Sequence, residues 1–348
     1  MGKIGAKALR WKNDLHFYRI DKEYVQFFDE HLTENANILY THRVPLTEIR
    51  KGGNVMPGQS PLSSIAKTFD IEILREFIKE EAFSAPIPAR VFVPMGEKPK
   101  EGWPLFIWFH GGGWVLGNIS TENSFCTKIA SLSKCIVMSV DYRLAPENPF
   151  PAAVNDAYEA LLYGFGKATS ELGINPRKIA IGGSSAGGNL TAVITHKFSN
   201  STFADIFPPV VFQLLVVPVT DNSATPESQP SWKENEFTPQ LPAEKMLWYR
   251  KLYLPNGDED LQNPEASPLF YPDNSFTKLP PCLILAAECD VLRSEAEAYN
   301  EKLIKNGINS KIIIYSGVPH PVMAMDAVLQ KGRDLGKDAA DAIRDAFY

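Results

Sequence analysis

The sequence predicts a doubly wound α/β domain on a mostly parallel sheet of about eight strands, with a helical cap. From residue 71 onward, short apolar runs of strand length alternate with segments of helical periodicity. Most of these runs are apolar at nearly every position, which is typical of parallel strands covered on both faces. The alternation breaks once, between residues 217 and 281, where prolines and an aromatic helical pattern replace any strand and indicate an insertion.

The predicted strands and helices follow in order along the chain. The first two strands alternate apolar and polar residues and predict a hairpin, whereas the later ones are almost continuously apolar. The predicted strands are residues 71–77, 87–94, 104–110, 135–141, 178–183, 210–218, 281–288 and 310–316. The predicted helices are residues 15–28, 38–49, 123–132, 152–163, 186–198, 293–305 and 326–347.

These elements predict three parts. Residues 1–68 form an N-terminal helical cap segment, residues 69–219 and 256–348 form the α/β domain, and residues 220–255 form a cap insertion. We expect aromatic residues of the two cap segments to pack on one another. These aromatic residues are Trp11, Phe17, Tyr24, Phe28, Trp248, Tyr249 and Tyr253.

Composition excludes several classes of protein. The 348 residues carry 35 Lys and Arg against 41 Asp and Glu, a net charge of -6, which does not suit a nucleic-acid binder. Four scattered cysteines predict no disulfide framework, and no metal-ligand spacing is present. No apolar run approaches the ~20 residues of a membrane span, and the N-terminal residues lack the apolar core of a signal peptide. We therefore expect a cytoplasmic protein without metal, cofactor or stable membrane anchor.

A glycine-serine motif follows the fifth predicted strand. Residues 183–187 read Gly-Ser-Ser-Ala-Gly and open a helical segment. Gly-x-Ser-x-Gly at a strand-to-helix junction is the pattern of a nucleophile elbow, a turn so tight that its neighbours must be small. Only Ser185 has a glycine two residues before it and two after it. Ser185 is therefore the expected nucleophile, and Ser184 occupies the variable position.

A run of glycines follows His110 at the end of the third predicted strand. Glycines at the carboxyl end of a strand let the backbone approach a ligand and present N–H groups to it. In acyl transfer, such N–H groups stabilise the tetrahedral oxyanion. We expect an oxyanion hole of N–H groups from Gly111, Gly112, Gly113 and Ala186. A phosphate cradle is the alternative, but neither glycine pattern of nucleotide-binding loops is present.

A serine hydroxyl needs a base that works near neutral pH, and histidine supplies one. In proteins with a nucleophile elbow, the acid and then the histidine follow the serine. His196 lies on the helix that Ser185 opens, roughly 16 Å away at 1.5 Å per residue, which is out of reach. His320 follows the last predicted strand, at the sheet edge where α/β active sites assemble. His320 is therefore the expected base.

The acid that orients the histidine should lie at a strand end between Ser185 and His320. Asp290 directly follows the seventh predicted strand, one β-α unit before His320. Its rivals are Asp221, one strand earlier, and Glu288. We expect Asp290 to be the acid, and Asp221 to be structural or to face the substrate.

Five motifs in this order resemble the hormone-sensitive-lipase-like branch of the α/β-hydrolases. They are HGGGW at 110–114, DYRLAPE at 141–147, FPAA at 150–153, GSSAGGN at 183–189 and DVLRSE at 290–295. The resemblance covers most of residues 70–348. It implies an α/β-hydrolase fold, a carboxylesterase for esters of short to medium acyl chains, no cofactor, and a cap built from the N-terminal helices and the 220–255 insertion. It also implies that the Asp-Tyr-Arg run braces the loop beneath the oxyanion hole.

The chain departs from the family pattern at four positions near the expected site. Ser184 stands where the family often has Asp, and Pro321 stands where Gly is usual. Val291 and Ser294 replace the usual Pro and Asp, whereas Asp290 is kept.

We expect a serine carboxylesterase that acts on a small ester. The sequence does not decide between a monomer and a homodimer. Hydrolysis of an amide or a lactone, and a carboxylesterase-like dehydration, are alternatives, because the triad does not distinguish these reactions. A non-catalytic receptor for a small ligand on the same fold is a further alternative, but a receptor of this kind is expected to lack the catalytic histidine. We expect Trp114, Ser184, Trp248 and Tyr249 to line the substrate pocket.

Overall fold

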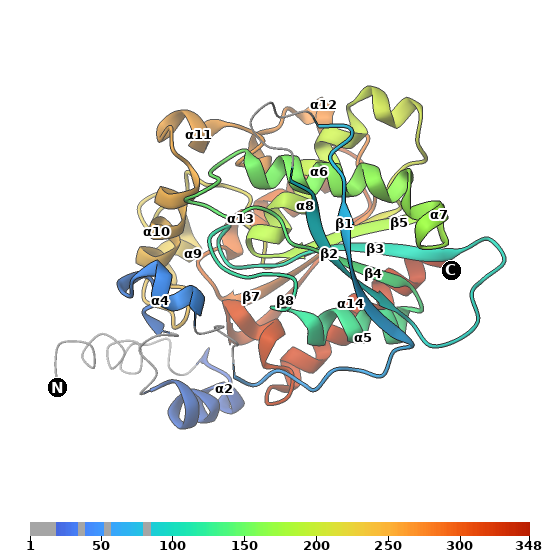
Figure 1. Ribbon diagram of the computed structural model, residues 1–348. Helices are drawn as coiled ribbons and strands as arrows, with labels where there is room; N and C mark the ends of the chain where they lie inside the picture. The colour runs from blue at the N-terminus through green and yellow to red at the C-terminus, as the bar shows by residue number, and fades with distance from the viewer. Residues whose placement is uncertain (1–18, 34–38, 52–56, 79–84) are drawn as a thin grey trace.

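The computed structural model describes residues 19–33, 39–51, 57–78 and 85–348. In these residues, eight strands form one sheet in the order β1-β2-β4-β3-β5-β6-β7-β8 (Figure 1). Strands β3 to β8 pair in parallel, whereas β1 pairs with β2, and β2 with β4, antiparallel. The predicted parallel sheet with a hairpin at its start is therefore confirmed.

The strands lie close to the predicted segments. They are β1 (Lys67–Ile73), β2 (Ile87–Val93), β3 (Trp103–Phe109), β4 (Ile136–Val140), β5 (Ile174–Ser184), β6 (Phe212–Val216), β7 (Cys282–Cys289) and β8 (Ser310–Pro319). The predicted starts of β1 and β5 were wrong, because each strand begins four residues earlier than expected. The polar residues of β1 are largely exposed at the sheet edge, so hydrophobicity alone does not mark its start.

Helices cover both faces of the sheet. Helices α5 (Asn123–Ser133) and α14 (Gln330–Phe347) contact each other on one face, and α6 (Ala152–Phe165) and α8 (Ala186–Ser199) contact each other on the opposite face. Helix α13 (Arg293–Lys305) packs on β7 and β8. The predicted final helix over 326–347 was too long, because a 3-10 helix ends at Met325 and α14 begins only at Gln330.

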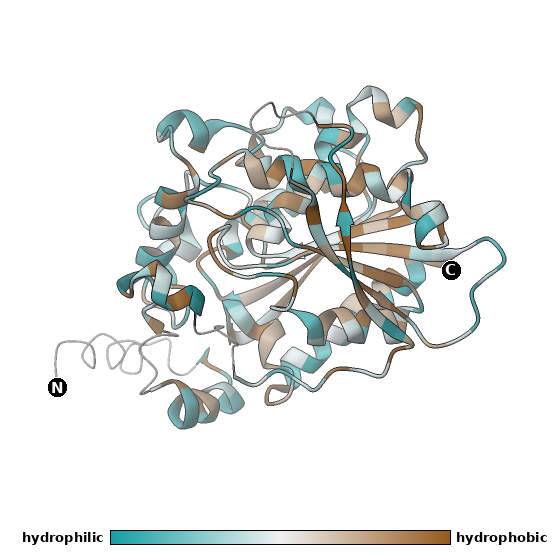
Figure 2. Cartoon of the chain, viewed as in Figure 1, coloured by the Kyte–Doolittle hydropathy of each residue, from teal (hydrophilic) through white to brown (hydrophobic). Residues whose placement is uncertain are grey.

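The two faces of the sheet bury separate apolar cores. Along β3, Leu105 and Ile107 enter one core while Phe106 and Trp108 enter the other. This alternation follows from the two-residue period of a strand, and it explains why the central strands are apolar at nearly every position. Figure 2 shows the apolar strands between helices whose outer faces are hydrophilic.

The segment between β6 and β7 contains no strand, as predicted. It contains α9 (Pro230–Glu234), α10 (Ala243–Tyr253), α11 (Asp258–Gln262) and α12 (Asp273–Phe276). The N-terminal residues contribute α2 (Lys22–Phe27) and α4 (Leu46–Lys51), and the short 3-10 helix Thr41–Arg43 contacts α10. Trp11 and Phe17 lie outside the described residues.

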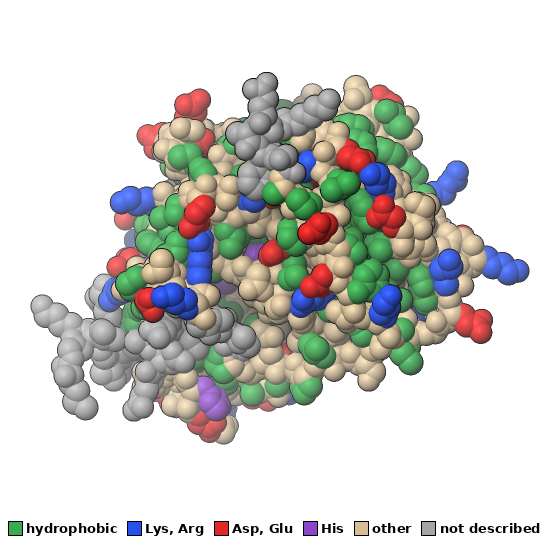
Figure 3. Space-filling view, in the orientation of Figure 1, with side chains coloured by type: hydrophobic (Ala, Val, Ile, Leu, Met, Phe, Trp, Pro, Cys, Tyr) green, Lys and Arg blue, Asp and Glu red, His purple; other side chains and the backbone are tan. Residues whose placement is uncertain are grey.

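The surface carries mixed charge on the face shown in Figure 3, where basic and acidic side chains are interspersed. Among the described residues, no helix combines the length and the apolar character that crossing a bilayer requires.

Candidate active site

The turn between β5 and α8 places Ser185 at the carboxyl edge of the sheet. Ser185 has φ 53 and ψ -114, and it is followed by Ala186, the first residue of α8. A Cβ at Gly187 would lie 1.9 Å from the carbonyl oxygen of Phe109, and one at Gly183 would lie 2.2 Å from the carbonyl oxygen of Gly187. No side chain fits at either position, which is the physical reason for the Gly-x-Ser-x-Gly pattern.

Ser185, His320 and Asp290 form one hydrogen-bonded row. The Ser185 Oγ lies 2.9 Å from Nε2 of His320, and the Nδ1 of His320 lies 2.6 Å from Oδ2 of Asp290. With the proton on Nδ1, the ring donates to Asp290 and accepts from the serine hydroxyl. Asp290 is buried, and its other oxygen accepts from the backbone N–H of Leu292 at 3.0 Å. The structure thus brings together the three residues that the sequence indicated.

The glycine loop after β3 lies beside Ser185, and a buried carboxylate holds it there. Glu122, which directly precedes α5, accepts from the backbone N–H of Gly111 at 3.2 Å and from the Ser184 hydroxyl at 2.6 Å. Its second oxygen accepts from Nε1 of Trp108 at 2.6 Å. Burial raises the pKa of Glu122, although these three donors favour the charged form.

The hydrogen bond from Gly111 to Glu122 contradicts one prediction about the oxyanion hole. The N–H of Gly111 points to Glu122 and is not available to an oxyanion, so the expected contribution of Gly111 is wrong. Gly112 and Gly113 remain, with φ of 118 and 61, in a backbone region that favours glycine. Ala186 is buried at the start of α8, where N–H groups have no partner within the helix. Nothing local in the sequence marks Glu122, so the role of Glu122 was not predicted.

The Asp-Tyr-Arg run braces the glycine loop, as the resemblance implied. The Tyr142 hydroxyl donates to the carbonyl oxygen of His110 at 2.8 Å, and the two rings stack 4.3 Å apart. The backbone N–H of Arg143 donates to Asp156 on α6, and the guanidinium pairs with the same carboxylate at 2.7 Å. Full burial lowers the pKa of His110 to about 4, so His110 is neutral and serves the loop structurally.

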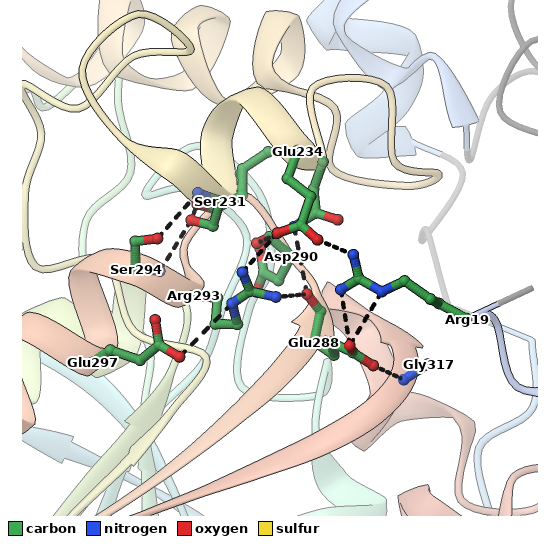
Figure 4. A network of polar contacts seen from close by, with 11 residues as sticks. Arg19, Ser231, Glu234, Glu288, Asp290, Arg293, Ser294, Glu297 and Gly317 are labelled. Atoms are coloured by element: carbon green, nitrogen blue, oxygen red, sulfur yellow. Dashed lines mark hydrogen bonds and ion pairs between the residues drawn. The ribbon is translucent and has the colours of Figure 1, made fainter. Parts of the chain in front are cut away.

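A second polar network braces the end of β8, directly before His320 (Figure 4). Glu288 at the end of β7 accepts from the backbone N–H of Gly317 at 2.7 Å and from Nη2 of Arg19 at 2.8 Å. Arg19 also pairs with Glu234, which in turn pairs with Arg293 at 2.7 Å. Glu288, the other acid considered for the triad, therefore holds β8 three residues before the histidine instead of contacting the imidazole.

Asp221, the other rival, has partners of its own. Its carboxylate accepts from the backbone N–H of Ser223 at 2.8 Å and from the hydroxyl of the same residue at 2.6 Å. Its carbonyl oxygen accepts from Arg250 at 2.9 Å. Asp221 is structural, which is one of the two roles expected for it.

His196 is also structural. It is buried between Tyr271, Phe276 and Tyr299, and its Nδ1 lies 2.7 Å from the Ser275 hydroxyl. Burial lowers its pKa to about 3. The hydrogen-bond partners of the His196 ring are Ser275 and Tyr299, whereas the imidazole beside Ser185 is that of His320.

A cavity of about 480 Å³ opens over Ser185 and His320. Its floor includes the glycine loop and Ser184, and its wall includes residues from the N-terminal segment, from α10 and the residues just before it, and from the segment after His320. The wall residues from the first two sources are Thr41, Ile49, Arg50, Gln59, Gln240, Leu241, Lys245 and Tyr249. Sites for small molecules are commonly of this size.

Two of the four expected pocket residues line this cavity and two do not. Ser184 and Tyr249 line it, and the Tyr249 ring lies so close to Gly113 that a Cβ there would be 2.3 Å away. Trp114 instead stacks on Tyr253 at 4.3 Å beneath α10, fully buried. Trp248 is half-buried beside Tyr249 on α10, outside the cavity lining. Helical geometry explains why Tyr249 lines the cavity and Trp248 does not, because adjacent residues on a helix point in different directions.

Within the described part of the chain, no three His, Cys, Asp or Glu side chains gather as metal ligands would. The four cysteines are buried and unbridged, and burial raises the pKa of Cys289, next to Asp290, to about 12. Such a thiol is a poor nucleophile.

Comparisons with known proteins agree with this geometry. A family profile described as alpha/beta hydrolase fold matches residues 106–324, more than half of the chain. An AB hydrolase superfamily protein of Schizosaccharomyces pombe is 57% identical over 329 residues, with 94% of each chain covered. An arylesterase of Saccharolobus solfataricus is 33% identical and covers 82% of this chain and 87% of its own. The solved hyperthermophilic esterase of Pyrobaculum calidifontis superposes with a TM-score of 0.80 at 31% identity, covering 94% of this chain and 98% of the other.

The role of Glu122 can be tested through stability. Replacing Glu122 by Ala leaves the N–H groups of Gly111 and Trp108 buried without an acceptor, at about 1–3 kcal/mol each. We expect Glu122→Ala to lower the free energy of unfolding by about 2–5 kcal/mol in urea titrations. Glu122→Gln keeps one acceptor oxygen and should lose clearly less. Equal losses, or none, would show that the glycine loop is held by other contacts.

Proposed function

The chain belongs to the hormone-sensitive-lipase-like, carboxylesterase-like family of α/β-hydrolases, and on this premise we propose that it hydrolyses carboxylic esters through Ser185, His320 and Asp290. The observation that carries the proposal is the row from Ser185 through His320 to Asp290 at 2.9 Å and 2.6 Å, at the floor of a cavity. The alternative of a non-catalytic receptor predicts a lost histidine, and here His320 is within hydrogen-bonding distance of the serine.

The proposed reaction has two halves. The Ser185 Oγ attacks the ester carbonyl while Nε2 of His320 takes the hydroxyl proton, and the resulting imidazolium is stabilised by Asp290. His320 then returns the proton to the leaving alkoxide, so that the alcohol departs and an acyl-Ser185 ester remains. In the second half, water gives its proton to His320 and attacks the acyl group. Ser185 then leaves with that proton and the carboxylic acid is released.

The negative charge on the carbonyl oxygen needs N–H donors in both halves. We assign this oxyanion hole to the backbone of Gly112, Gly113 and Ala186, because the N–H of Gly111 is directed to Glu122. Each donor of such a hole typically contributes roughly 10²–10³ in rate. Glu122 and Tyr142 contribute indirectly, because they hold the loop that carries two of these donors.

We further propose that the N-terminal segment and the 220–255 insertion form a cap that selects the acyl chain. Thr41 and Ile49 from the first, and Leu241 and Tyr249 from the second, line the cavity above Ser185. Tyr24 in α2 is buried and its hydroxyl donates to Gln240 at 3.0 Å, which connects the two segments. Because Tyr249 fills space beside the glycine loop, we expect short to medium acyl chains to be preferred.

Ser185→Ala should abolish ester hydrolysis without unfolding the chain, because the Ser185 hydroxyl makes its hydrogen bond within the site and not to the rest of the fold. An aryl phosphonate should label Ser185 in the wild type, located by peptide mass spectrometry. Labelling of Ser184 instead, or retained turnover in the Ala variant, would contradict the assignment. Ser184→Ala is the matched control and should keep a phosphonate-reactive Ser185.

Asp290→Asn should leave KM near the wild-type value and lower kcat by about 10⁴, because a neutral partner no longer secures the imidazole tautomer. Steady-state kinetics with 4-nitrophenyl acetate measures both constants. Asp221→Asn is the control at the neighbouring strand end, and its kcat should stay within a few-fold of wild type. If the two variants exchange these effects, the acid lies on β6 and not on β7.

Tyr249→Ala should shift the preferred acyl chain to greater length, because it enlarges the cavity beside Gly113. The shift should be graded, since each methylene is worth only ~1–3 kcal/mol. Values of kcat/KM for 4-nitrophenyl esters from acetate to decanoate measure it. Trp248→Ala, one residue away and outside the cavity lining, should leave the profile unchanged. An equal loss at all lengths in Tyr249→Ala would show that this residue only supports the cap.

A further inference from the structure

The N-terminal segment contacts the end of β8 directly before His320. The backbone N–H of Asp21 donates to the carbonyl oxygen of Gly317 at 2.8 Å. Gly317 has a φ of 69, and a Cβ there would lie 2.5 Å from the carbonyl oxygen of Arg19. A glycine is therefore required at this position for the two backbones to touch. Residues 19–21 thus pack on the backbone three residues before the proposed base.

The pairing of β8 with β7 is interrupted at the same point. The register shifts between Ala287 and Cys289, where β7 advances by two residues while β8 advances by four. Such an interruption removes ladder hydrogen bonds and redirects the strand. The N–H of Gly317 donates instead to the Glu288 carboxylate at 2.7 Å, and its carbonyl oxygen accepts from Asp21. A side chain and the N-terminal segment therefore replace the bonds that a regular ladder would supply.

Arg19 holds Glu288 in this position (Figure 4). Its Nη2 and Nε lie 2.8 and 3.2 Å from one oxygen of Glu288, while the other oxygen accepts from Gly317. Arg19 also pairs with Glu234 on α9, which pairs with Arg293 on α13 at 2.7 Å. Single exposed ion pairs contribute little, whereas a network with several charge-assisted bonds orients its members. Arg19 therefore determines where the Glu288 carboxylate meets β8.

The same segment also contacts the chain after His320. The Glu23 carboxylate accepts from the backbone N–H of Gln330, the first residue of α14, at 2.6 Å. Lys331 donates to the carboxylate of Asp21 at 2.5 Å. The loop that carries His320 is therefore bound to the N-terminal segment at both of its ends.

His320 must meet two partners at once. Its Nε2 lies 2.9 Å from the Oγ of Ser185, and its Nδ1 lies 2.6 Å from the Oδ2 of Asp290. Both partners follow other strands, β5 and β7, so a shift of the end of β8 moves the imidazole relative to both. Catalytic groups must be held within about 0.5 Å of the productive geometry, and a misplacement of about 1 Å can cost about 10²-fold in rate.

We propose that Arg19 is a positioning residue for ester hydrolysis. It holds Glu288 against Gly317, and this contact keeps His320 within reach of the nucleophile. The inference rests on the proposed function, and it gives the N-terminal segment a role in the chemical step besides the lining of the cavity. Because the proposed reacting groups lie at the ends of strands, Arg19 affects the rate of their reaction and not the fit of the substrate.

Arg19→Ala tests the inference with esters of different length. For 4-nitrophenyl acetate, kcat should fall about 10- to 100-fold while KM stays within about three-fold of wild type, because the base is misplaced and the cavity is unchanged. The same fold loss should appear for every ester from acetate to decanoate. A shifted length preference with unchanged kcat for acetate would show that Arg19 only supports the cap, and would overturn the inference.

Arg43→Ala is the matched control in the same N-terminal segment. The Arg43 side chain is 36% exposed, against 35% for Arg19, and pairs with Glu244 on α10 at 2.7 Å. Its loss should leave kcat for acetate within about three-fold of wild type, because a partly exposed ion pair away from β8 contributes little. Circular dichroism and urea unfolding establish that each variant is folded.

Glu288→Gln tests whether Arg19 acts through Glu288. Glutamine keeps an acceptor for the N–H of Gly317 but loses the charge that pairs with Arg19. Because both residues act through one contact, adding Arg19→Ala to Glu288→Gln should lower kcat by no more than about three-fold. Losses that multiply in the double variant would overturn the inference.

The remaining outcomes separate this inference from the proposed function. Wild-type kcat in Arg19→Ala overturns the inference while ester hydrolysis stands. If Arg19→Ala does not fold, Arg19→Lys replaces it, because an ammonium still pairs with one carboxylate but lacks the planar fork that serves two. A folded Arg19→Lys should lose kcat, and wild-type kcat there overturns the inference. If the wild type hydrolyses no ester and Ser185 resists phosphonate labelling, the proposed function fails and the inference fails with it.

Discussion

The contact between the backbones of β3 and the elbow is the constraint on which the site depends. The carbonyl oxygen of Phe109 approaches Gly187 so closely that no Cβ fits, and Gly183 packs against Gly187 in the same way. This contact holds the ends of β3 and β5 side by side, so the glycine loop that leaves β3 lies beside Ser185. The φ of 53 at Ser185 is unfavourable for a non-glycine residue and persists because its neighbours impose it, including the bond from its N–H to the carbonyl oxygen of Val216 at 2.8 Å.

Carboxylates then hold each segment that meets at this point. Glu122 accepts from the glycine loop after β3, and the partly exposed Glu288 accepts from the N–H of Gly317 near the end of β8. The fully buried Glu295 on α13 accepts from the backbone N–H groups of Thr220 and Asp221 after β6, and from Nε1 of Trp232. Charge-assisted hydrogen bonds are stronger than neutral ones, so each carboxylate specifies the position of the backbone that supplies its donors.

On the proposed function, chemistry and substrate selection are supplied by different parts of the chain. The proposed triad and N–H donors lie at the carboxyl ends of β3, β5, β7 and β8, where strand pairing determines their positions. The residues that we propose to select the substrate lie in the N-terminal segment and on α10, outside the sheet. Arg250 holds α10 within the insertion, because it donates to the carbonyl oxygen of Asp221 and lies 4.4 Å from the Trp232 ring. On this proposal, substitutions on α10 change substrate preference without disturbing Ser185.

The amino-acid sequence by itself determined the mostly parallel character of the sheet, the hairpin, the insertion after β6 and the three residues of the row at Ser185. These features produce local signals: an apolar run, a glycine spacing, or a polar residue directly after a strand. Only the tertiary structure decided that the N–H of Gly111 is bonded to Glu122, that Glu288 accepts from the N–H of Gly317, and that Trp114 lies outside the cavity lining. Glu122 is 62 residues from Ser184, and Arg19 is 269 residues from Glu288. Partners so far apart leave no periodicity in the sequence, because only the packing of the whole chain brings them within hydrogen-bonding distance.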